Sequence, residues 1–302
     1  AFEYVITKCL ASPIAEIRQL ARDAQKELLK VIPSMVERPT SARGKIYQKF
    51  VAQTDKDLEK MAANLATSNQ QLATSNQHVE LVEWDVDAED KIIASLFYKY
   101  STIGYQSIKD QVSRMNTKQK LAIIKKTIAR RQVRQHRLVR AFENTYYKFD
   151  IVANFGAYRD LHRHRMLTQE RQRFTTELGH DTPPDLIAAK LEKPYVLAIS
   201  KIDKFYRKIK KKFPDAAQYV VMMGNKMRWY QWENLRELAW EAELRTGPQG
   251  HPDYRKIEHE KVRAVAAIHP TLVEVLKFVD FKNYDLARRE SEKRIDRKLG
   301  IK

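Results

Sequence analysis

The chain has 302 residues, of which 43% are hydrophobic and 31% are charged, and its formal net charge at pH 7 is +18. No run approaches the ~18–20 apolar residues of a membrane span, and no secretory signal is visible. The single Cys9 excludes an internal disulfide framework and a cysteine-rich metal site, and it favours a reducing cytoplasm. The positive charge favours polyanionic partners, which include nucleic acid, anionic membranes and phosphorylated metabolites. The first residue is Ala rather than Met, which leaves open whether the natural chain begins further upstream.

The first half of the chain predicts mostly helices. Residues 12–32 have helical spacing of apolar residues, Ser12 can cap the first turn, Pro13 suits that turn and Pro33 ends the helix. The remaining elements expected here are an amphipathic helix at roughly 45–65, a short strand at 79–86, and helices at 88–100 and 117–140.

A heptad occurs twice between the second helix and the strand, as Leu65–Gln71 and Leu72–His78. Its Ser, Thr, Asn and Gln side chains offer little apolar surface to bury. We therefore interpret the repeat as a linker or as the frayed end of a helix.

The second half predicts a strand-like stretch at 145–153 and then further helices. A turn cluster at 180–185 caps a short helix, and Pro214 ends a long one. The other expected elements are helices at 194–212, from Asp215, at 233–245 and at 252–268, a packed segment at 271–279 and a charged tail at 288–302.

The two ends of the chain share an internal repeat. Ala1-Phe2-Glu3 is followed by Pro13, a helix and the segment Pro33–Glu37. The same order recurs in a stretch that begins at Ala239-Trp240-Glu241 and continues through Pro252, a helix and Pro270–Glu274. The parallel spacing favours a duplicated module, of which the chain holds the end of one copy and a second copy.

The most informative segment runs from Tyr158 to Thr168 and closes with Arg173 and Phe174. It is rich in Arg and His and follows the strand-like stretch 145–153. Arg keeps its charge in proteins, and its planar guanidinium matches phosphate oxygens. Arginines that converge beside a strand end predict a nucleotide or dinucleotide phosphate site, and the alternative is a solvated basic helix face.

Possible metal ligands have no supporting spacing. His162 and His164 form an H-x-H pair, but no third ligand stands at a useful distance, so we expect no metal site. The acidic cluster at 85–90 lacks the glycine and the twelve-residue spacing of a calcium loop. It more simply charges a helix N-terminus.

Aromatic and methionine side chains near 222–240 could line a flavin or a folate, although their helical spacing is more typical of a core. They are Met222, Met223, Trp229, Trp232 and Trp240. The chain has 8 glycines and no G-x-G-x-x-G or P-loop motif, so a Rossmann or Walker site is not expected. Basic runs such as 208–212 are typical of solvated helix faces.

The Arg/His segment resembles the signature of flavin-dependent thymidylate synthases. That signature begins R-H-R-x-x-S, and Arg163–Thr168 matches it with Thr in place of Ser. Glu170, followed by Arg173 and Phe174, is similar to the second half of the signature. The stretch from 142 reaches Arg163 without a gap, as in the family.

A second block follows in the expected order. Arg228–Leu238, followed by Leu244 and Arg245, resembles the N-x-R-x-L helix of the family, which closes in Leu-Arg. The resemblance covers roughly residues 79–280. It implies an α+β fold of the thymidylate-synthase-complementing type, which is helix-rich and has long helices flanking an antiparallel sheet.

The resemblance also implies a division into modules. We expect residues 1–38 to be the C-terminal end of a preceding module, 39–78 a helical low-complexity linker, 79–287 the synthase-like domain and 288–302 a charged tail. The family builds its sites between subunits of a tetramer, which implies a homo-oligomer or a pseudo-tetramer with a sister module. A cytoplasmic protein is expected, with no membrane partner and no nucleic-acid partner.

The family's reaction converts dUMP to dTMP with no cysteine nucleophile. The resemblance implies FAD as cofactor, NADPH and methylenetetrahydrofolate as co-substrates, and dUMP as substrate. The residues that would hold FAD are Arg163, His164, Arg165 and Asn234. The residues that would bind dUMP are Glu170, Arg173 and Arg245, and Arg245 and Thr168 would act in catalysis.

Several positions depart from the family pattern. The segment after Thr168 is two residues shorter and lacks the second Ser. Asp160 stands where the family has Gln, and its carboxylate would repel a nucleotide phosphate. Gln218 stands where a phosphate-binding Arg is expected, and Trp240 replaces an Asn that contacts FAD. Each lost bidentate Arg–phosphate contact costs on the order of 1.5–3 kcal/mol.

These departures leave two alternatives to an active enzyme. In the first, the module has decayed and binds FAD or nucleotide poorly or completes the site of a partner module. In the second, the basic run 130–137 forms a helix that follows nucleic-acid phosphates.

Overall fold

The computed structural model describes residues 2–66, 78–284 and 287–300. The chain divides into two compact units, of which one comprises Ala1–Ser75 with Phe205–Tyr219 and the other Asn76–Lys204 with Val220–Lys302. None of the described helices is both long and apolar enough to cross a membrane.

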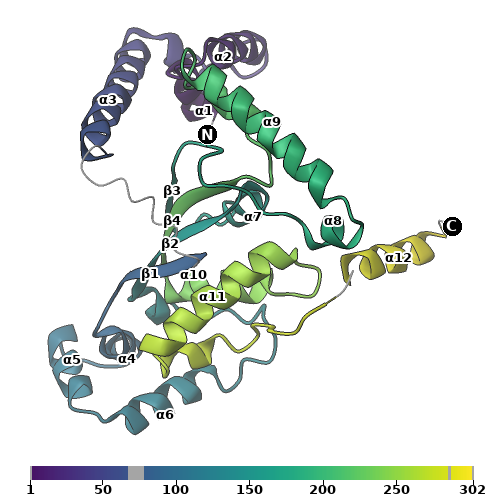
Figure 1. Cartoon of the computed structure of the whole chain (residues 1–302). Coiled ribbons are helices and arrows are strands. Elements are labelled where there is room, and N and C mark those ends of the chain that lie inside the picture. Colours follow the sequence, from purple (N-terminus) through teal and green to yellow (C-terminus); the bar gives the residue numbers. More distant parts are fainter. Residues whose placement is uncertain (1, 67–77, 285–286, 301–302) are drawn as a thin grey trace. The chain divides into compact units, whose positions relative to one another are not determined.

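The first unit is built from helices among its described residues (Figure 1). They are α1 (Phe2–Leu10), α2 (Ala15–Leu28), α3 (Ala42–Ala66) and the short 3-10 turns η1 (Pro33–Met35) and η2 (Arg38–Thr40).

Helix α2 is shorter than the predicted helix at 12–32. The Ser12 hydroxyl accepts a hydrogen bond from the Ile14 backbone at 3.2 Å, ahead of the first turn. The buried Gln25 side chain donates to the Val36 carbonyl at 2.6 Å and fixes the chain beyond the helix. The repeated heptad falls almost entirely on residues 67–77, outside the described residues.

In the second unit, the described residues form one four-stranded antiparallel sheet with the strand order β1-β2-β4-β3. Its strands are β1 (Val79–Trp84), β2 (Tyr146–Asn154), β3 (Thr168–Arg171) and β4 (Lys226–Asn234). The predicted strands at 79–86 and 145–153 are therefore confirmed, as is a helix-rich α+β fold with an antiparallel sheet.

The central strands alternate between a buried and an open face. In β2, Tyr147, Phe149 and Ile151 are fully buried, whereas Tyr146 is exposed. The buried face packs against α10 (Leu235–Arg245) and α11 (Pro252–Ile268), which Figure 1 draws beside the sheet. Burial of these aliphatic and aromatic side chains is the main stabilising term of the domain.

Further helices complete this unit. They are α4 (Ala88–Tyr98), α5 (Tyr105–Ser113), α6 (Thr117–Ile128), α7 (Phe155–Leu161), α8 (Pro184–Ala188), α12 (Ala287–Leu299) and the turns η3 (Arg140–Glu143) and η5 (Leu272–Val275). Helix α9 (Glu192–Lys210) contributes to both units, and η4 (Ala216–Val220) is a 3-10 turn where a helix from Asp215 was predicted.

Two sequence predictions are wrong in this unit. The helix predicted at 117–140 ends at Ile128, because the side chain of Arg131 turns into the interior and forms a bidentate ion pair with Glu243. The run 130–137 is therefore a loop and not a phosphate-following helix. Strand β4 was also missed, and Trp229 and Trp232 lie on a strand rather than at helical spacing.

Candidate functional site

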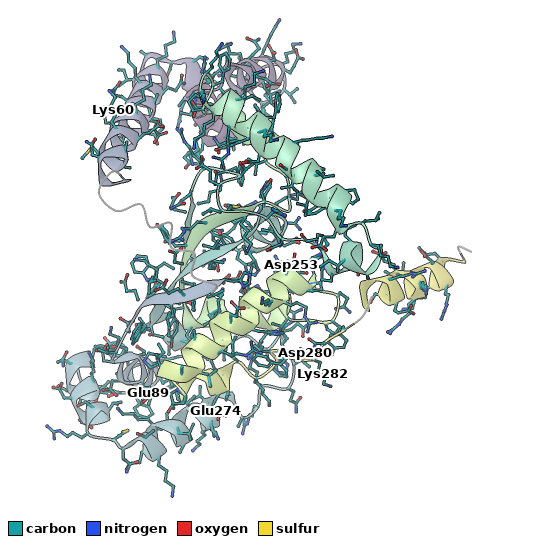
Figure 2. The ribbon with its side chains drawn as sticks, in the orientation of Figure 1. Lys60, Glu89, Asp253, Glu274, Asp280 and Lys282 are labelled. Atoms are coloured by element: carbon teal, nitrogen blue, oxygen red, sulfur yellow. The ribbon has the colours of Figure 1, made fainter. Side chains whose placement is uncertain are left out.

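His164 lies at the centre of the predicted motif and is buried. It follows α7, whose first turn is capped by the Asn154 side chain, which accepts a hydrogen bond from the Ala157 backbone at 2.8 Å. The same Asn154 donates from Nδ2 to Asp253, which lies in the first turn of α11 (Figure 2). These contacts fix the segment that leads into His164.

The imidazole of His164 bridges two residues of α10. Its Nδ1 atom lies 3.1 Å from Glu237 Oε1, and Arg245 donates from Nε to its Nε2 atom at 3.0 Å. Because an arginine Nε–H can only donate, Nε2 accepts, and the ring hydrogen is on Nδ1 and faces the Glu237 carboxylate. The two motif blocks predicted from the sequence therefore meet at this histidine.

The orientation of α10 explains this contact. Asn234 is the N-cap of the helix, and its Oδ1 accepts a hydrogen bond from the Glu237 backbone at 2.9 Å. Residues four apart share one helix face, so Glu237, Glu241 and Arg245 lie on the same side of α10. Arg245 also lies over the Tyr254 ring, with 5.7 Å between its guanidinium carbon and the ring centroid.

Arg163 and Arg165 flank the buried His164 and are both exposed. Arg163 lies 3.6 Å from the Asp160 carboxylate, a long ion pair between partly exposed side chains. Such a pair contributes about 0–1 kcal/mol, so it leaves the guanidinium accessible to an anion in solution. Asp160, which stands where the family has Gln, is therefore the acidic neighbour of Arg163.

Thr168 and Glu170 lie on the open face of the sheet. They pair with Trp232 and Tyr230 of β4, whereas Gln169 between them pairs with the buried Gln231. Neighbouring strand residues point to opposite faces, so Thr168 and Glu170 face away from α10. The structure therefore does not bring them together with His164 and Arg245 in this unit.

Gln169 instead supports the motif from behind. Its Nε2 atom donates to the carbonyl of His162 at 3.0 Å and to the carbonyl of His164 at 3.1 Å. Arg173 is exposed and lies two residues beyond β3. The neighbouring Phe174 packs against Phe155, with 4.3 Å between ring centroids.

The other departures occupy structural positions. Trp240 is half-buried, and the guanidinium carbons of Arg134 and Arg137 lie 5.2 and 5.6 Å from its ring centroid. Gln218 lies in η4 and belongs to the other compact unit. No group of His, Cys, Asp or Glu side chains suited to a metal ion is found within residues 2–66, 78–284 and 287–300.

Sequence reasoning missed a buried charge cluster behind the site. Lys261 of α11 is fully buried, and its Nζ atom lies 2.6 Å from Glu233, 3.2 Å from Glu241 and 3.3 Å from Glu258. Gln231 accepts a fourth contact from Nζ at 3.0 Å and donates to Glu241 at 3.3 Å. The only local signal was the four-residue spacing of charges along α10.

Burial shifts the acidity of every member of this cluster. Burial opposes the charge of Lys261, but the surrounding carboxylates outweigh it and raise the pKa of the ammonium group. Burial raises the pKa of Glu233 well above its usual range and raises the pKa of Glu258 to about 8. Glu241 is equally buried, but the Lys261 ammonium group lowers its pKa.

Comparison with known families identifies the class of protein. The family model for thymidylate synthase complementing proteins matches residues 80–271, which is more than half of the chain. The chain therefore belongs to the thymidylate synthase complementing protein family, the flavin-dependent thymidylate synthases that its two motif blocks resemble.

Individual relatives agree with this assignment. The chain is 36% identical over 283 residues to a UPF0159 protein of Chlamydia muridarum, and the matched stretch covers 93% of this chain and 53% of that protein. It is 35% identical over 295 residues to a UPF0159 protein of Chlamydia pneumoniae, and the matched stretch covers 97% of this chain and 55% of that protein. The chain thus spans about half the length of these two relatives.

A solved structure has the same fold. A UMP/dUMP methylase of Streptomyces cacaoi, crystallised with 5-Br dUMP, matches with a TM-score of 0.50 at 17% sequence identity. The match covers 66% of this chain and 94% of the methylase chain.

Proposed function

We propose that this chain belongs to an enzyme that methylates dUMP to dTMP with the help of FAD, taking the carbon from methylenetetrahydrofolate and the electrons from NADPH. The observation that carries the proposal is the hydrogen bond between Arg245 and His164, which joins two family motifs across 81 residues. Family membership and the fold support the same reading.

The residues around His164 fit the diphosphate of FAD. Arg163 and Arg165 present exposed guanidinium groups on both sides of a buried, hydrogen-bonded histidine. Two accessible cations on a backbone segment that is held by hydrogen bonds suit a diphosphate, because guanidinium groups form bidentate hydrogen bonds with phosphate oxygens. We propose that these two arginines and His164 hold FAD, with Asn234 acting chiefly by capping α10. When bound, reduced flavin would supply the electrons that turn the transferred carbon into a methyl group.

Arg245 is the best candidate to hold the pyrimidine ring of dUMP. Its Nε atom is committed to His164, which fixes the plane of the guanidinium, and the group is only half-buried. A fixed cation beside the ring could stabilise negative charge on the ring oxygens as the reaction proceeds. Arg173, Glu170 and Thr168 are proposed to act on the open face of the sheet.

The separation of the two faces supports shared sites. Within this unit, Thr168 and Glu170 lie on one face of the sheet, and Arg245 lies on the other. We propose that a complete site forms where two modules meet, in a homo-oligomer or with a sister module. Residues 1–38 are proposed to be the end of such a sister module, since α1, α2 and η1 repeat the order of α10, α11 and η5.

The first experiment is the visible absorption spectrum of the purified chain with added FAD, followed by titration with dUMP. Flavin bands that shift on binding and shift again with dUMP support the proposal. The expected variants are Arg163→Gln and Arg165→Gln, which should weaken FAD binding, with the exposed Arg159→Gln as a matched control on α7. Failure of the chain to bind either molecule would contradict the proposal for this chain.

A decayed module is the second candidate function. Asp160 beside Arg163, and the ring of Trp240 beneath Arg134 and Arg137, favour it. Such a module would bind FAD or dUMP poorly and would restore activity only to a partner module. The nucleic-acid alternative loses its main support, because Arg131 is buried against Glu243.

A further inference from the structure

The buried cluster around Lys261 has more acidic groups than basic ones. Among the described residues, three carboxyl groups surround the single ammonium group of Lys261, and all four side chains have no exposed surface. Isolated buried charges are costly, so the cluster is stable only when protons neutralise part of its negative charge. Glu233 Oε1 lies 2.6 Å from the Lys261 ammonium group, and the Glu233 carboxyl also bonds with the carboxylate of Glu241, as expected for a carboxyl that carries its own proton.

The acidities divide the cluster into fixed and exchangeable charges. Glu241 is held ionised, with a lowered pKa, whereas burial raises the pKa of Glu233 well above its usual range. Burial raises the pKa of Glu258 only to about 8. At neutral pH Glu241 and Lys261 therefore balance each other, and Glu258 is the carboxyl that ionises first when the pH rises.

The cluster and the site share one face of helix α10. Glu241 lies between Glu237 and Arg245 on one face of α10, and His164 spans the two outer residues. Arg245 favours the ionised form of Glu258. The charged groups that face Glu258 come from α10, α11 and β4, and they are Glu241, Arg245, Lys261 and Glu233.

We propose that the Lys261 cluster is a positioning element for Arg245, and that loss of the Glu258 proton draws the Arg245 guanidinium away from His164. Arg245 has one strong acceptor on His164 while Glu258 is neutral. Arg245 lies over the ring of Tyr254, which is one helical turn before Glu258 on α11. Ionisation of Glu258 therefore adds a negative charge on the side of the guanidinium that faces α11, in a region of low dielectric where attraction is strong. The effect on dUMP binding rests on the proposed function, whereas the hydrogen bond between Arg245 and His164 is present in the chain without a ligand.

The test is histidine-selective ¹⁵N NMR of the unliganded chain from about pH 6 to pH 9.5. The His164 signals are assigned by their loss in His164→Gln. We expect a protonated Nδ1 and an unprotonated Nε2 near neutral pH. Above pH 8, the Nε2 signal should move towards that of an imidazole nitrogen without a donor. This movement would report the ionisation of Glu258, because the imidazole keeps its hydrogen on Nδ1 throughout.

Glu258→Gln is the informative variant, because an amide mimics the neutral carboxyl in shape. The high-pH movement of the His164 signal should be absent in Glu258→Gln and present in Glu260→Gln, a matched control two residues further along α11. The inference would be overturned if the His164 signal did not move at high pH in the unaltered chain. It would also be overturned if the signal moved equally in Glu258→Gln. The first arm uses the unaltered chain and so does not depend on the folding of any variant.

Binding of dUMP separates this inference from the proposed function. If the chain binds dUMP, its affinity should fall about tenfold between pH 7 and pH 9, and that fall should be absent in Glu258→Gln. The His164 movement without dUMP binding would support the inference and count against the proposed function for this chain. Binding of dUMP without the movement would support the function and overturn the inference.

Discussion

Arg245 and His164 are joined by a hydrogen bond of 3.0 Å although 81 residues separate them in the sequence. The donor is the arginine Nε, so the plane of the guanidinium is set by the imidazole, and the imidazole in turn is held by Glu237. The pair makes the loop after α7 and the last turn of α10 into one rigid structure. Any ligand that uses Arg245 meets a cation whose direction is already fixed.

Arg245→Lys should therefore be a severe change despite its unchanged charge. Lysine lacks the planar fork, so the His164 acceptor loses its aligned donor. We expect the free energy of unfolding to fall by about 1–2 kcal/mol and the affinity for dUMP to fall at least about tenfold. Urea unfolding and calorimetric titration with dUMP measure the two effects.

Arg159→Lys is the matched control for this change. The Arg159 side chain is exposed and contacts only the Met223 sulfur among the contacts found within the described residues. It should leave both quantities unchanged within error. If Arg245→Lys binds dUMP as well as the unaltered chain does, Arg245 does not hold the nucleotide.

The sequence predicts the helices well where proline and glycine mark their ends. Helix α11 has the predicted bounds of 252–268, because Pro252 suits the first turn and Pro270 follows the last. Strand β4 was missed for a physical reason. Its buried face begins with the apolar Met227 and Trp229 but continues with Gln231 and Glu233, so the alternation of apolar and polar residues is broken.

The site, like the fold, could be predicted only in part. The approach of His164 to Arg245 follows from two motif blocks in the expected order. The separation of Thr168 from Arg245 does not follow, because it depends on which face of β3 each side chain occupies. The Lys261 cluster could not be predicted either, because its members come from β4, α10 and α11 and no local pattern marks a buried lysine.

Asn234 offers a test that separates capping from cofactor binding. Its Oδ1 caps α10, and serine can do the same through its hydroxyl. Asn234→Ala should lower the free energy of unfolding by about 1 kcal/mol, whereas Asn234→Ser should lower it by only a few tenths. FAD binding should follow the cap, so that Asn234→Ser retains it and Asn234→Ala loses part of it. Equal loss of FAD binding in both variants would indicate that the amide contacts FAD directly.

Lys261→Met should strongly destabilise the domain. The methionine removes the cation and leaves buried carboxyls without their partner, for which the typical cost is about 3–5 kcal/mol. Guanidinium unfolding at pH 7 measures the change. The cost should be smaller at pH 5, because protonation neutralises the Glu241 carboxylate that the substitution leaves without its cation.

Neutralising the carboxyls should rescue Lys261→Met. The variant that combines it with Glu233→Gln, Glu241→Gln and Glu258→Gln has no buried charge at this position and should recover most of the lost stability. If Lys261→Met alone is as stable as the unaltered chain, the cluster is not held by the ammonium group. A matched surface change, Lys256→Met on the same helix, should alter stability by less than about 0.5 kcal/mol.

Glu258→Gln should change how stability depends on pH. Burial raises the pKa of Glu258 from its ordinary value of 4.5 to about 8, so the folded chain binds a proton that the unfolded chain has released. The stabilisation is therefore complete below about pH 4.5 and is lost as the pH rises towards 8, at about 1.4 kcal/mol per pH unit. Glu258→Gln has no such proton and should gain stability relative to the unaltered chain at each step between about pH 5 and pH 8. Denaturant unfolding at several pH values, with Glu260→Gln as control, measures the difference. Parallel pH profiles for Glu258→Gln and the unaltered chain would mean that Glu258 is already ionised at neutral pH and that the cluster holds its proton elsewhere.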